Sequence, residues 1–272
     1  MNLEDYFISQ FKNKYIGDDG AFIDKFVYSK DAFFQNVHFK TEWMNYYQIA
    51  QKAMLINISD AIAMNAQAKY ALLSVAMPKN MTKKNMQELA DGFKDIAEKY
   101  NIKIIGGDTI SNVKLDITIT IISKTNKPLL RRGVQNRDIL AYTGDLGNSL
   151  KDLKKLLSLG KLHKKSKFLN INLRENFINK TNRHLKAGMD ISDGLFSDLG
   201  KMSSVNKIGF RFYKKIPKSV GCSGEEYEML VAFSPRDKKA ILRKAKQSRT
   251  KLTIFASASR KKYINRCKAH HF

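Results

Sequence analysis

Carboxylates recur at short turns along this sequence, usually beside glycine or serine. They occur in Gly17-Asp18-Asp19-Gly20, Ser29-Lys30-Asp31, Ser59-Asp60, Gly106-Gly107-Asp108 and Asp190-Ile191-Ser192-Asp193-Gly194. Taken singly, such a turn is a common solvated feature, because Asp and Gly both favour turns. Taken together, the turns could bring several carboxylates to one place, and carboxylate oxygens are ligands that Mg²⁺ prefers. The pattern therefore favours a magnesium site that binds phosphate groups and supports phosphoryl transfer.

The segment Lys103-Ile104-Ile105-Gly106-Gly107-Asp108 shows this design most simply. Its apolar, β-branched start predicts a strand over residues 102–105 that stops at the two glycines. Glycine lets the backbone turn sharply and approach a ligand closely, so Asp108 is expected at a strand end beside that ligand. Asp31 is expected at the end of an earlier strand in the same way. Asp60 is expected within a mostly buried helix, where an acid is costly unless it is paired or bound to a cation.

Other polar residues have a structural explanation beside a functional one. His38 lies among aromatic residues, where a histidine is more often a packed, hydrogen-bonded side chain than a ligand. Arg131, next to Arg132, could be an ordinary surface charge or a bidentate phosphate ligand. Ser192 could simply cap the helix that follows it. Glu225 could belong to a solvated helix start.

Hydrophobic periodicity predicts strands that alternate with helices, which indicates an α/β or α+β fold. Helices are expected over residues 3–14, 46–64 and 150–159, after a cap at Thr82 and after Gly194. Strands are expected over residues 21–28, 70–77, 102–105, 115–123 and 138–142, and loops with short helices over 161–186. The polar stretch 124–128 predicts a boundary between two domains, residues 1–127 and 128–272.

The chain is strongly basic, with 49 Lys and Arg against 25 Asp and Glu and a formal net charge of +24. Such a charge suggests nucleic acid, anionic lipid or a phosphorylated ligand as partner. The lysines are spread along the chain and no zinc-finger spacing occurs, which argues against nucleic acid. A general lysine bias gives the same charge. A basic nucleic-acid-binding protein with structural acidic turns nevertheless remains an alternative.

The remaining composition indicates a reducing compartment. Cys222 and Cys267 lie far apart without a CxxC motif, so two free thiols are expected rather than a disulfide or a zinc site. The N-terminus lacks the pattern of a signal peptide, and no apolar run is long enough to span a bilayer. We therefore expect a cytoplasmic protein with no membrane partner.

Six segments, in this order, resemble motifs of the thiamine-monophosphate kinase family. They are Ile16-Gly17-Asp18-Asp19, Asn36-Val37-His38-Phe39, Asn57-Ile58-Ser59-Asp60-Ala61-Ile62-Ala63-Met64, Ile105-Gly106-Gly107-Asp108-Thr109, Asp190-Ile191-Ser192-Asp193-Gly194-Leu195 and Gly224-Glu225-Glu226-Tyr227-Glu228. The resemblance extends to about residue 230. It implies the two-domain fold shared with aminoimidazole ribonucleotide synthetase and selenophosphate synthetase. In that fold the N-terminal domain has a mixed sheet used for dimerisation, and the C-terminal domain is α/β.

The resemblance also implies an activity. It is the ATP- and Mg²⁺-dependent phosphorylation of thiamine monophosphate to thiamine diphosphate, by direct in-line transfer in a homodimer. By motif position, the implied metal ligands are Asp19, Ser29, Asp31, Asp60, Asp108, Asp190 and Asp193. The implied ATP contacts are Gly107, Arg131 and Ser192, and the implied substrate contacts are His38 and Glu225. The alternative within the fold is another ATP-using synthetase or maturation enzyme.

Some positions depart from the family pattern. Lys30 stands where a threonine is usual, and the proline-arginine segment expected after the glycine-rich turn has Leu173-Arg174 as its nearest match. Of the family's closing motif, this sequence retains only His271-Phe272. The aromatic side chain expected to pack against the thiamine ring is therefore not identified.

Overall fold

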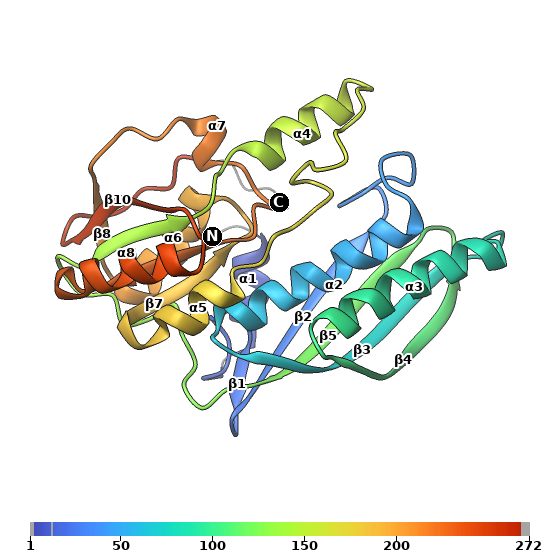
Figure 1. Cartoon of the computed structure of the whole chain (residues 1–272), viewed down its shortest axis with the longest axis horizontal. Coiled ribbons are helices and arrows are strands. Elements are labelled where there is room, and N and C mark those ends of the chain that lie inside the picture. Colours follow the sequence, from blue (N-terminus) through green and yellow to red (C-terminus); the bar gives the residue numbers. More distant parts are fainter. Residues whose placement is uncertain (1–2, 12, 268–272) are drawn as a thin grey trace.

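The computed structural model describes residues 3–11 and 13–267, and it contains two five-stranded sheets (Figure 1). The first half contains α1 (Leu3–Ser9), β1 (Ala21–Ile23), β2 (Phe26–Phe34), α2 (Tyr46–Ala63), β3 (Gln67–Pro78), α3 (Lys83–Lys99), β4 (Lys103–Asn112) and β5 (Asp116–Lys124). The second half contains β6 (Ile139–Thr143), α4 (Asn148–Leu157), α5 (Glu175–Thr181), η1 (Asn182–His184), β7 (Leu185–Ile191), α6 (Leu195–Asn206), β8 (Gly209–Phe212), α7 (Lys218–Gly221), β9 (Glu228–Phe233), η2 (Pro235–Asp237), α8 (Lys238–Gln247) and β10 (Leu252–Ser259). The expected α/β architecture is confirmed.

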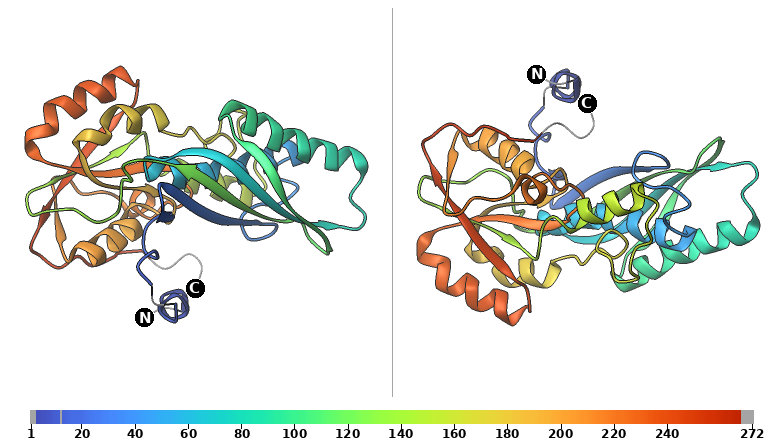
Figure 2. Two further views of the ribbon diagram at one scale, coloured as in Figure 1. Left: turned by 90° about the horizontal axis from the view of Figure 1, so that it is seen from below. Right: turned by 90° about the horizontal axis from the view of Figure 1, so that it is seen from above.

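The first sheet has the order β1-β2-β5-β3-β4, with helices α2 and α3 on one face (Figure 2). Its strands pair antiparallel except β3 and β4, which are parallel because α3 crosses between them. The expected alternation along β5 is confirmed, since Ile117, Ile119 and Ile121 are buried against the helices. On the opposite face, Tyr28, Tyr70 and Leu72 remain substantially exposed. One face of the first sheet is therefore open.

Helix α2 is the central element of the molecule. It begins with a capping box, in which the Asn45 side chain accepts from the Gln48 backbone and the Gln48 side chain accepts from the Asn45 backbone. It packs on α3 and on the first sheet, and it also contacts β7 of the second sheet. One core cluster runs from Ile58 of α2 to Val231 of β9. The helix therefore joins the two halves and fixes what lies between them.

The second sheet has the order β7-β9-β6-β10-β8 and is covered on both faces. In β9, Met229 and Val231 belong to the core that includes α5 and α8, whereas Leu230 and Ala232 belong to the core around α6. Every residue of β9 is consequently buried, as is typical of a strand with helices on both sides.

Three expectations from the sequence are wrong. The strand expected over residues 21–28 is a hairpin that turns at Asp24 and Lys25, so Asp31 lies within β2 and not at its end. The strand expected to stop at residue 105 continues through Gly106 and Gly107 to Asn112, because the whole segment pairs with β3. The two cysteines are not free, since a disulfide joins Cys222 to Cys267.

Candidate active site

A cavity of about 160 Å³ lies where the C-terminal half of α2 meets β2 and the turn between β7 and α6. It brings together residues from across the sequence, namely Asp31, Ala32, His38, Ile56, Asp60, Asp190, Ser192, Asp193, Glu225 and Tyr227. Carboxylate oxygens of Asp19, Asp60 and Asp190 also lie within 4.8 Å of one another. Most of the acidic turns noted in the sequence therefore converge, although they come from separate elements.

Two residues of α2 orient the acids beside them. Ser59 donates from Oγ to Asp190 Oδ2 over 2.6 Å in a buried hydrogen bond. Asn57 accepts from the Asp31 backbone N–H through its Oδ1 at 2.9 Å. Because α2 is buried along most of its length, its side chains have fixed positions. Ser59 and Asn57 therefore hold the C-terminal end of β7 and the middle of β2 in place relative to Asp60.

Burial and mutual repulsion disfavour the charged form of these acids. Burial is the largest cause that raises the pKa of Asp31 to about 6, and the Asp19 and Asp193 carboxylates add to the shift. Burial also raises the pKa of Asp60 and Asp190 well above the usual range, and neighbouring carboxylates raise both further. Several carboxyl groups are thus held close together. This arrangement destabilises the folded protein unless protons or a cation neutralise the carboxylates.

Arg131 neutralises one of these acids in part. Its guanidinium Nη2 and Nε both donate to Asp19 Oδ1, the Nε bond being 3.1 Å long, and its backbone N–H donates to Asp18 Oδ1 at 2.7 Å. Burial raises the pKa of Asp19, and Arg131 opposes this shift. The arginine expected to bind ATP therefore holds Asp19 in place.

Asp193 belongs to a second ionic group at the start of α6. Lys201 donates from Nζ to Asp193 Oδ2 and lies 3.2 Å from Asp198 Oδ1. Burial raises the pKa of Asp198 to about 7, although Lys201 lowers it. Lys201 thus fixes the turn that carries Ser192 and Asp193.

His38 and Glu225 lie at the cavity from opposite halves of the chain. The backbone N–H of Phe34 donates to His38 Nδ1 at 3.0 Å, so the neutral imidazole carries its proton on Nε2. Glu225 pairs with Lys52 at 2.7 Å, and the Lys52 ammonium lies 3.7 Å from the centroid of the Phe168 ring. His38 and Glu225 together thus place one nitrogen donor and one carboxylate beside the acidic cluster.

Five expected site residues are not among the lining residues of the cavity. Two of them, Asp19 and Arg131, pair with each other in the acidic cluster, and the other three lie on β2 and β4. Ser29 is buried on β2 and donates from Oγ to the Asn57 carbonyl oxygen at 3.4 Å. Gly107 and Asp108 lie on β4, whose residues are almost all exposed. Asp31, Ile119, Leu73 and Gly107 pair in one row across the sheet, which separates β4 from β2 by about 14 Å.

Asp108 is also on the wrong face of the sheet to join the cluster in its own chain. Asp108 pairs with Ser74 of β3, and this pair is one residue further along the strands than the row that contains Asp31. Successive side chains of a strand point to opposite faces. Asp108 therefore points to the open face, whereas Asp31 points toward α2.

Comparisons with known proteins identify the family of this chain. The family described as AIR synthase related protein, N-terminal domain, matches residues 17–125. A thiamine-monophosphate kinase from Leptospira interrogans serogroup Icterohaemorrhagiae serovar Lai is 30% identical over 250 residues, which cover 84% of this chain and 79% of that protein. This chain belongs to the thiamine-monophosphate kinase family. A second thiamine-monophosphate kinase, from Nitrosopumilus maritimus, is 29% identical over 222 residues that cover 75% of this chain and 72% of that protein.

Solved structures show the same fold. AaThiL complexed with AMPPCP and TMP superimposes with a TM-score of 0.86 at 22% identity, covering 99% of this chain and 96% of that chain. HypE in the HypE-HypF complex has a TM-score of 0.78 at 14% identity, covering 95% and 93%. The fold is thus common to thiamine-monophosphate kinases and to a hydrogenase maturation protein.

Several residues that shape the site of this family member were not predicted from the sequence. Lys52 is 1% exposed inside an apolar helix, and the cost of burying an unpaired ammonium was a signal that it had an acidic partner. Glu226 and Glu228 are buried rather than solvated. Glu228 accepts from Arg174 at 2.6 Å and from Thr143 at 2.7 Å. These contacts tie the glycine-rich turn and the segment before α5 to β9.

The acidic cluster has the chemistry of a magnesium site. Asp19 Oδ2 is buried and has no hydrogen-bond partner among residues 3–11 and 13–267, so it is available as a ligand. The cluster offers only oxygen atoms, and hard cations such as Mg²⁺ prefer oxygen. The residues therefore fit a magnesium ion.

Proposed function

We propose that this protein transfers the terminal phosphoryl group of ATP to thiamine monophosphate and so forms thiamine diphosphate. The observation that carries the proposal is the convergence of Asp19, Asp60 and Asp190 within 4.8 Å in a chain of the thiamine-monophosphate kinase family. The family assignment favours this reaction over that of another ATP-using synthetase or maturation enzyme. No side chain is required as a nucleophile, because a substrate phosphate oxygen attacks directly.

We assign the metal site to the acidic cluster. Asp19, Asp60 and Asp190 would hold Mg²⁺. Asp31 and Asp193 would lie at the border of this metal site, and Ser29 would lie behind Asp31. When bound, Mg²⁺ would neutralise the charge that develops on the transferred phosphoryl group. Ser59 keeps the Asp190 carboxylate in a fixed orientation.

The substrate contacts in the proposal are His38 and Glu225. The His38 Nε2 proton can be donated to a phosphate oxygen of thiamine monophosphate. Glu225 can accept from the amino group of the pyrimidine ring, and Lys52 holds its carboxylate toward the cavity. Ser192 contributes a hydroxyl at the same cavity and is assigned to ATP, together with Arg131.

We further propose that the active form is a homodimer and that Asp108 and Gly107 act in the partner's site. The open face of the first sheet supports this, because Tyr28, Tyr70 and Ile110 would otherwise keep apolar surface in water. Asp108 lies on that same face. Pairing of two such faces would bring the Asp108 of one subunit toward the acidic cluster of the other.

The proposed domains are residues 1–127 and 128–272. The first sheet ends with β5 at Lys124 and the second begins with β6 at Ile139, which supports a division between them. The continuous core through α2 implies that the two domains do not move freely.

The reaction is tested by incubating the protein with ATP, Mg²⁺ and thiamine monophosphate and measuring thiamine diphosphate by chromatography. ADP should form in equal amounts. Formation of ADP without thiamine diphosphate would contradict the proposed acceptor.

The dimer is tested separately by mixing two inactive variants, Asp60→Asn and Asp108→Asn. If Asp108 serves the partner's site, half of the dimers are mixed and each has one intact site, so about a quarter of the parental activity should return. If Asp108 serves its own subunit, the mixture should stay inactive. Size-exclusion chromatography of each variant should show the dimer unchanged.

A further inference from the structure

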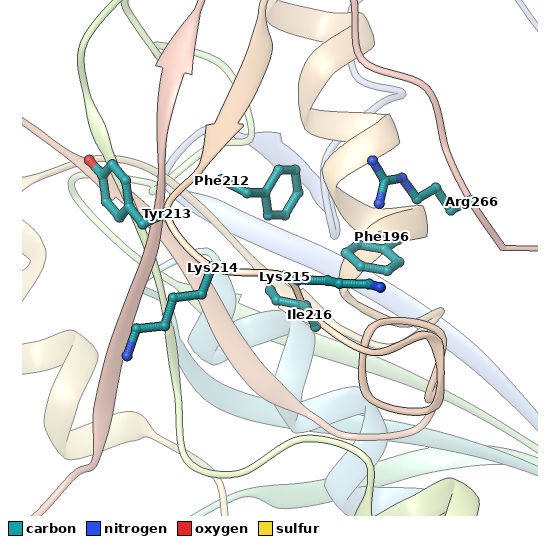
Figure 3. Close-up of a pocket in the computed structure, with 7 residues that line it drawn as sticks. All are labelled: Phe196, Phe212, Tyr213, Lys214, Lys215, Ile216 and Arg266. Atoms are coloured by element: carbon teal, nitrogen blue, oxygen red, sulfur yellow. The ribbon is translucent and has the colours of Figure 1, made fainter.

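A second cavity, of about 270 Å³, lies at the edge of the second sheet (Figure 3). It is lined by Phe196, Phe212, Tyr213, Lys214, Lys215, Ile216 and Arg266. None of these residues lines the acidic cavity. The two cavities thus share no lining residue, and the proposed kinase reaction does not use the second one.

Aromatic rings form the rigid part of this cavity. Phe196 is 3% exposed, and its ring meets that of Phe212 edge to face with the centroids 6.0 Å apart. Gly221 lies so close that an added Cβ would be 2.3 Å from the Phe196 ring. Phe212 in turn lies 5.8 Å from the Phe255 ring. The two rings are thus fixed from behind, and the half-buried Phe212 ring offers apolar surface to a flat ligand in front of the buried Phe196.

Two cations point toward these rings. Figure 3 shows the guanidinium of Arg266 and the ammonium of Lys215 directed into the space around Phe196, whereas the ammonium of Lys214 points away from it. No salt bridge joins Lys215 or Arg266 to an acid in the part of the chain that the structure describes. An anion between them would form charge-assisted hydrogen bonds, and Arg and Lys are both common phosphate ligands.

Arg266 owes its position to contacts on both sides of it in the sequence. The Tyr263 hydroxyl donates to the Phe196 carbonyl oxygen at 2.7 Å, and Asn265 donates to Ser197 Oγ at 3.4 Å. On the other side, the disulfide joins Cys267 to the end of α7. A side chain between such anchors loses less entropy on binding than one on a free chain end.

We propose that this cavity binds a small phosphomonoester with a flat aromatic or heteroaromatic body. The phosphate lies between Arg266 and Lys215, and the ring packs on Phe212, which Phe196 supports from behind. The cavity is slightly below the usual range for small-molecule sites, about 300–1,000 Å³, which suits a one-ring ligand. The site binds this ligand in addition to the substrates of the kinase reaction.

The test is isothermal titration calorimetry of the full-length, disulfide-bonded protein with phenyl phosphate as the probe. EDTA is present and nucleotide is omitted, so that no metal ion or nucleotide in the acidic cavity attracts the probe. The parent should bind phenyl phosphate, and inorganic phosphate about tenfold more weakly because it has no ring. The double variant Lys215→Gln/Arg266→Gln should bind phenyl phosphate at least about tenfold more weakly.

The matched control is Lys214→Gln, which also removes a positive charge from a lining residue, but one whose ammonium points away. Its affinity should stay within about twofold of the parent. Equal losses in Lys214→Gln and in either single variant, Lys215→Gln or Arg266→Gln, would show that only diffuse surface charge attracts the probe. Absence of binding by the parent, or parental affinity in the double variant, would also overturn the proposal. Kinase activity should be unchanged in all these variants, which separates this test from that of the proposed function.

Discussion

Replacing Asp60 by Asn should make the metal-free protein more stable while it abolishes the response to Mg²⁺. Asp60 lies with Asp19 and Asp190 in a group of carboxylates within 4.8 Å. Its pKa in the folded protein is raised by burial and then by Asp31 and Asp190. The folded state therefore prefers protonated Asp60, and the ionised acid opposes folding. This cost is present at neutral pH and disappears as the pH falls toward the unfolded pKa of about 3.9.

The size of the effect follows from the geometry. Two unit charges 4.8 Å apart repel by about 3 kcal/mol at an effective dielectric constant of about 20. Protonation limits the cost of one acid at pH 7 to about 4 kcal/mol, because each pH unit above about 3.9 contributes about 1.4 kcal/mol. A buried amide that lacks a partner costs about 1 kcal/mol or more. Asp60→Asn should therefore stabilise the metal-free protein by about 1–3 kcal/mol, or about 3–10 °C in Tm.

The assay is thermal unfolding in EDTA and then in increasing Mg²⁺. The parent should gain about 2.7 kcal/mol when Mg²⁺ reaches about 100 times its Kd, and Asp60→Asn should gain much less. Asp91→Asn is the control, because Asp91 pairs with Lys94 and accepts from Gln87 on the surface of α3, and its loss should change stability by less than about 0.5 kcal/mol. A variant Asp60→Asn that is less stable in EDTA and still responds to Mg²⁺ like the parent would refute the reasoning.

Three further outcomes follow from other contacts. Mg²⁺ affinity, measured by calorimetry, should fall at least about tenfold per pH unit below about 6, because the pKa of Asp31 is raised to about 6 and those of Asp60 and Asp190 are raised as well, and these acids must ionise to bind the metal; an affinity that is constant from pH 7 to 5 would contradict this. Arg174→Ala should lower the free energy of unfolding in urea by about 2–3 kcal/mol, because it leaves the buried Glu228 with Lys167 as its remaining cation; Lys94→Gln, at the surface, should cost less than about 0.5 kcal/mol, and equal losses would argue against a buried pair. Gly107→Ala should destabilise strongly and weaken dimer formation in sedimentation experiments, because the new Cβ would meet the backbone of β3 at 1.6 Å; a dimer of parental stability would contradict this.

The sequence predicts well those helices and strands whose own hydrophobic periodicity determines their structure. Helix α2 was expected over residues 46–64 and is observed at Tyr46–Ala63, because its apolar residues continue around the whole helix and few residues in it favour turns. The alternating isoleucines likewise identify β5. Asp60 accordingly lies in a mostly buried helix, as expected, whereas the strand β7 that carries Asp190 was not predicted, because the segment before it shows little periodicity.

Predictions failed where partners distant in the sequence decide the local conformation. Two glycines in a row indicate a turn, but parallel pairing with β3 keeps Gly106 and Gly107 extended in β4. The hairpin at Asp24-Lys25 was missed because it lacks the glycine or asparagine typical of such turns. Both errors led to a wrong predicted position for an acid. Asp31 lies inside its strand and not at its end, and Asp108 lies on the open face of the first sheet.

The disulfide could not be predicted, because the pairing depends on tertiary structure. Cys222 and Cys267 are 45 residues apart, and no local motif relates them. They meet only because the segment after β10 runs along α6, where the Tyr263 hydroxyl donates to the Phe196 carbonyl oxygen. The expectation of free thiols rested on spacing alone. His271 and Phe272, considered as remnants of the family's closing motif, lie outside the described residues.

The central claim is that the Asp19, Asp60 and Asp190 cluster binds the Mg²⁺ that phosphoryl transfer to thiamine monophosphate requires. The most direct measurement is the initial rate of thiamine diphosphate formation against Mg²⁺ concentration, at saturating ATP, for the parent and Asp190→Asn. The parent should show a Mg²⁺-dependent rate, and the variant should lose at least about a hundredfold, equivalent to about 2.7 kcal/mol of transition-state stabilisation. A variant with the parental rate and the parental Mg²⁺ dependence would contradict the claim.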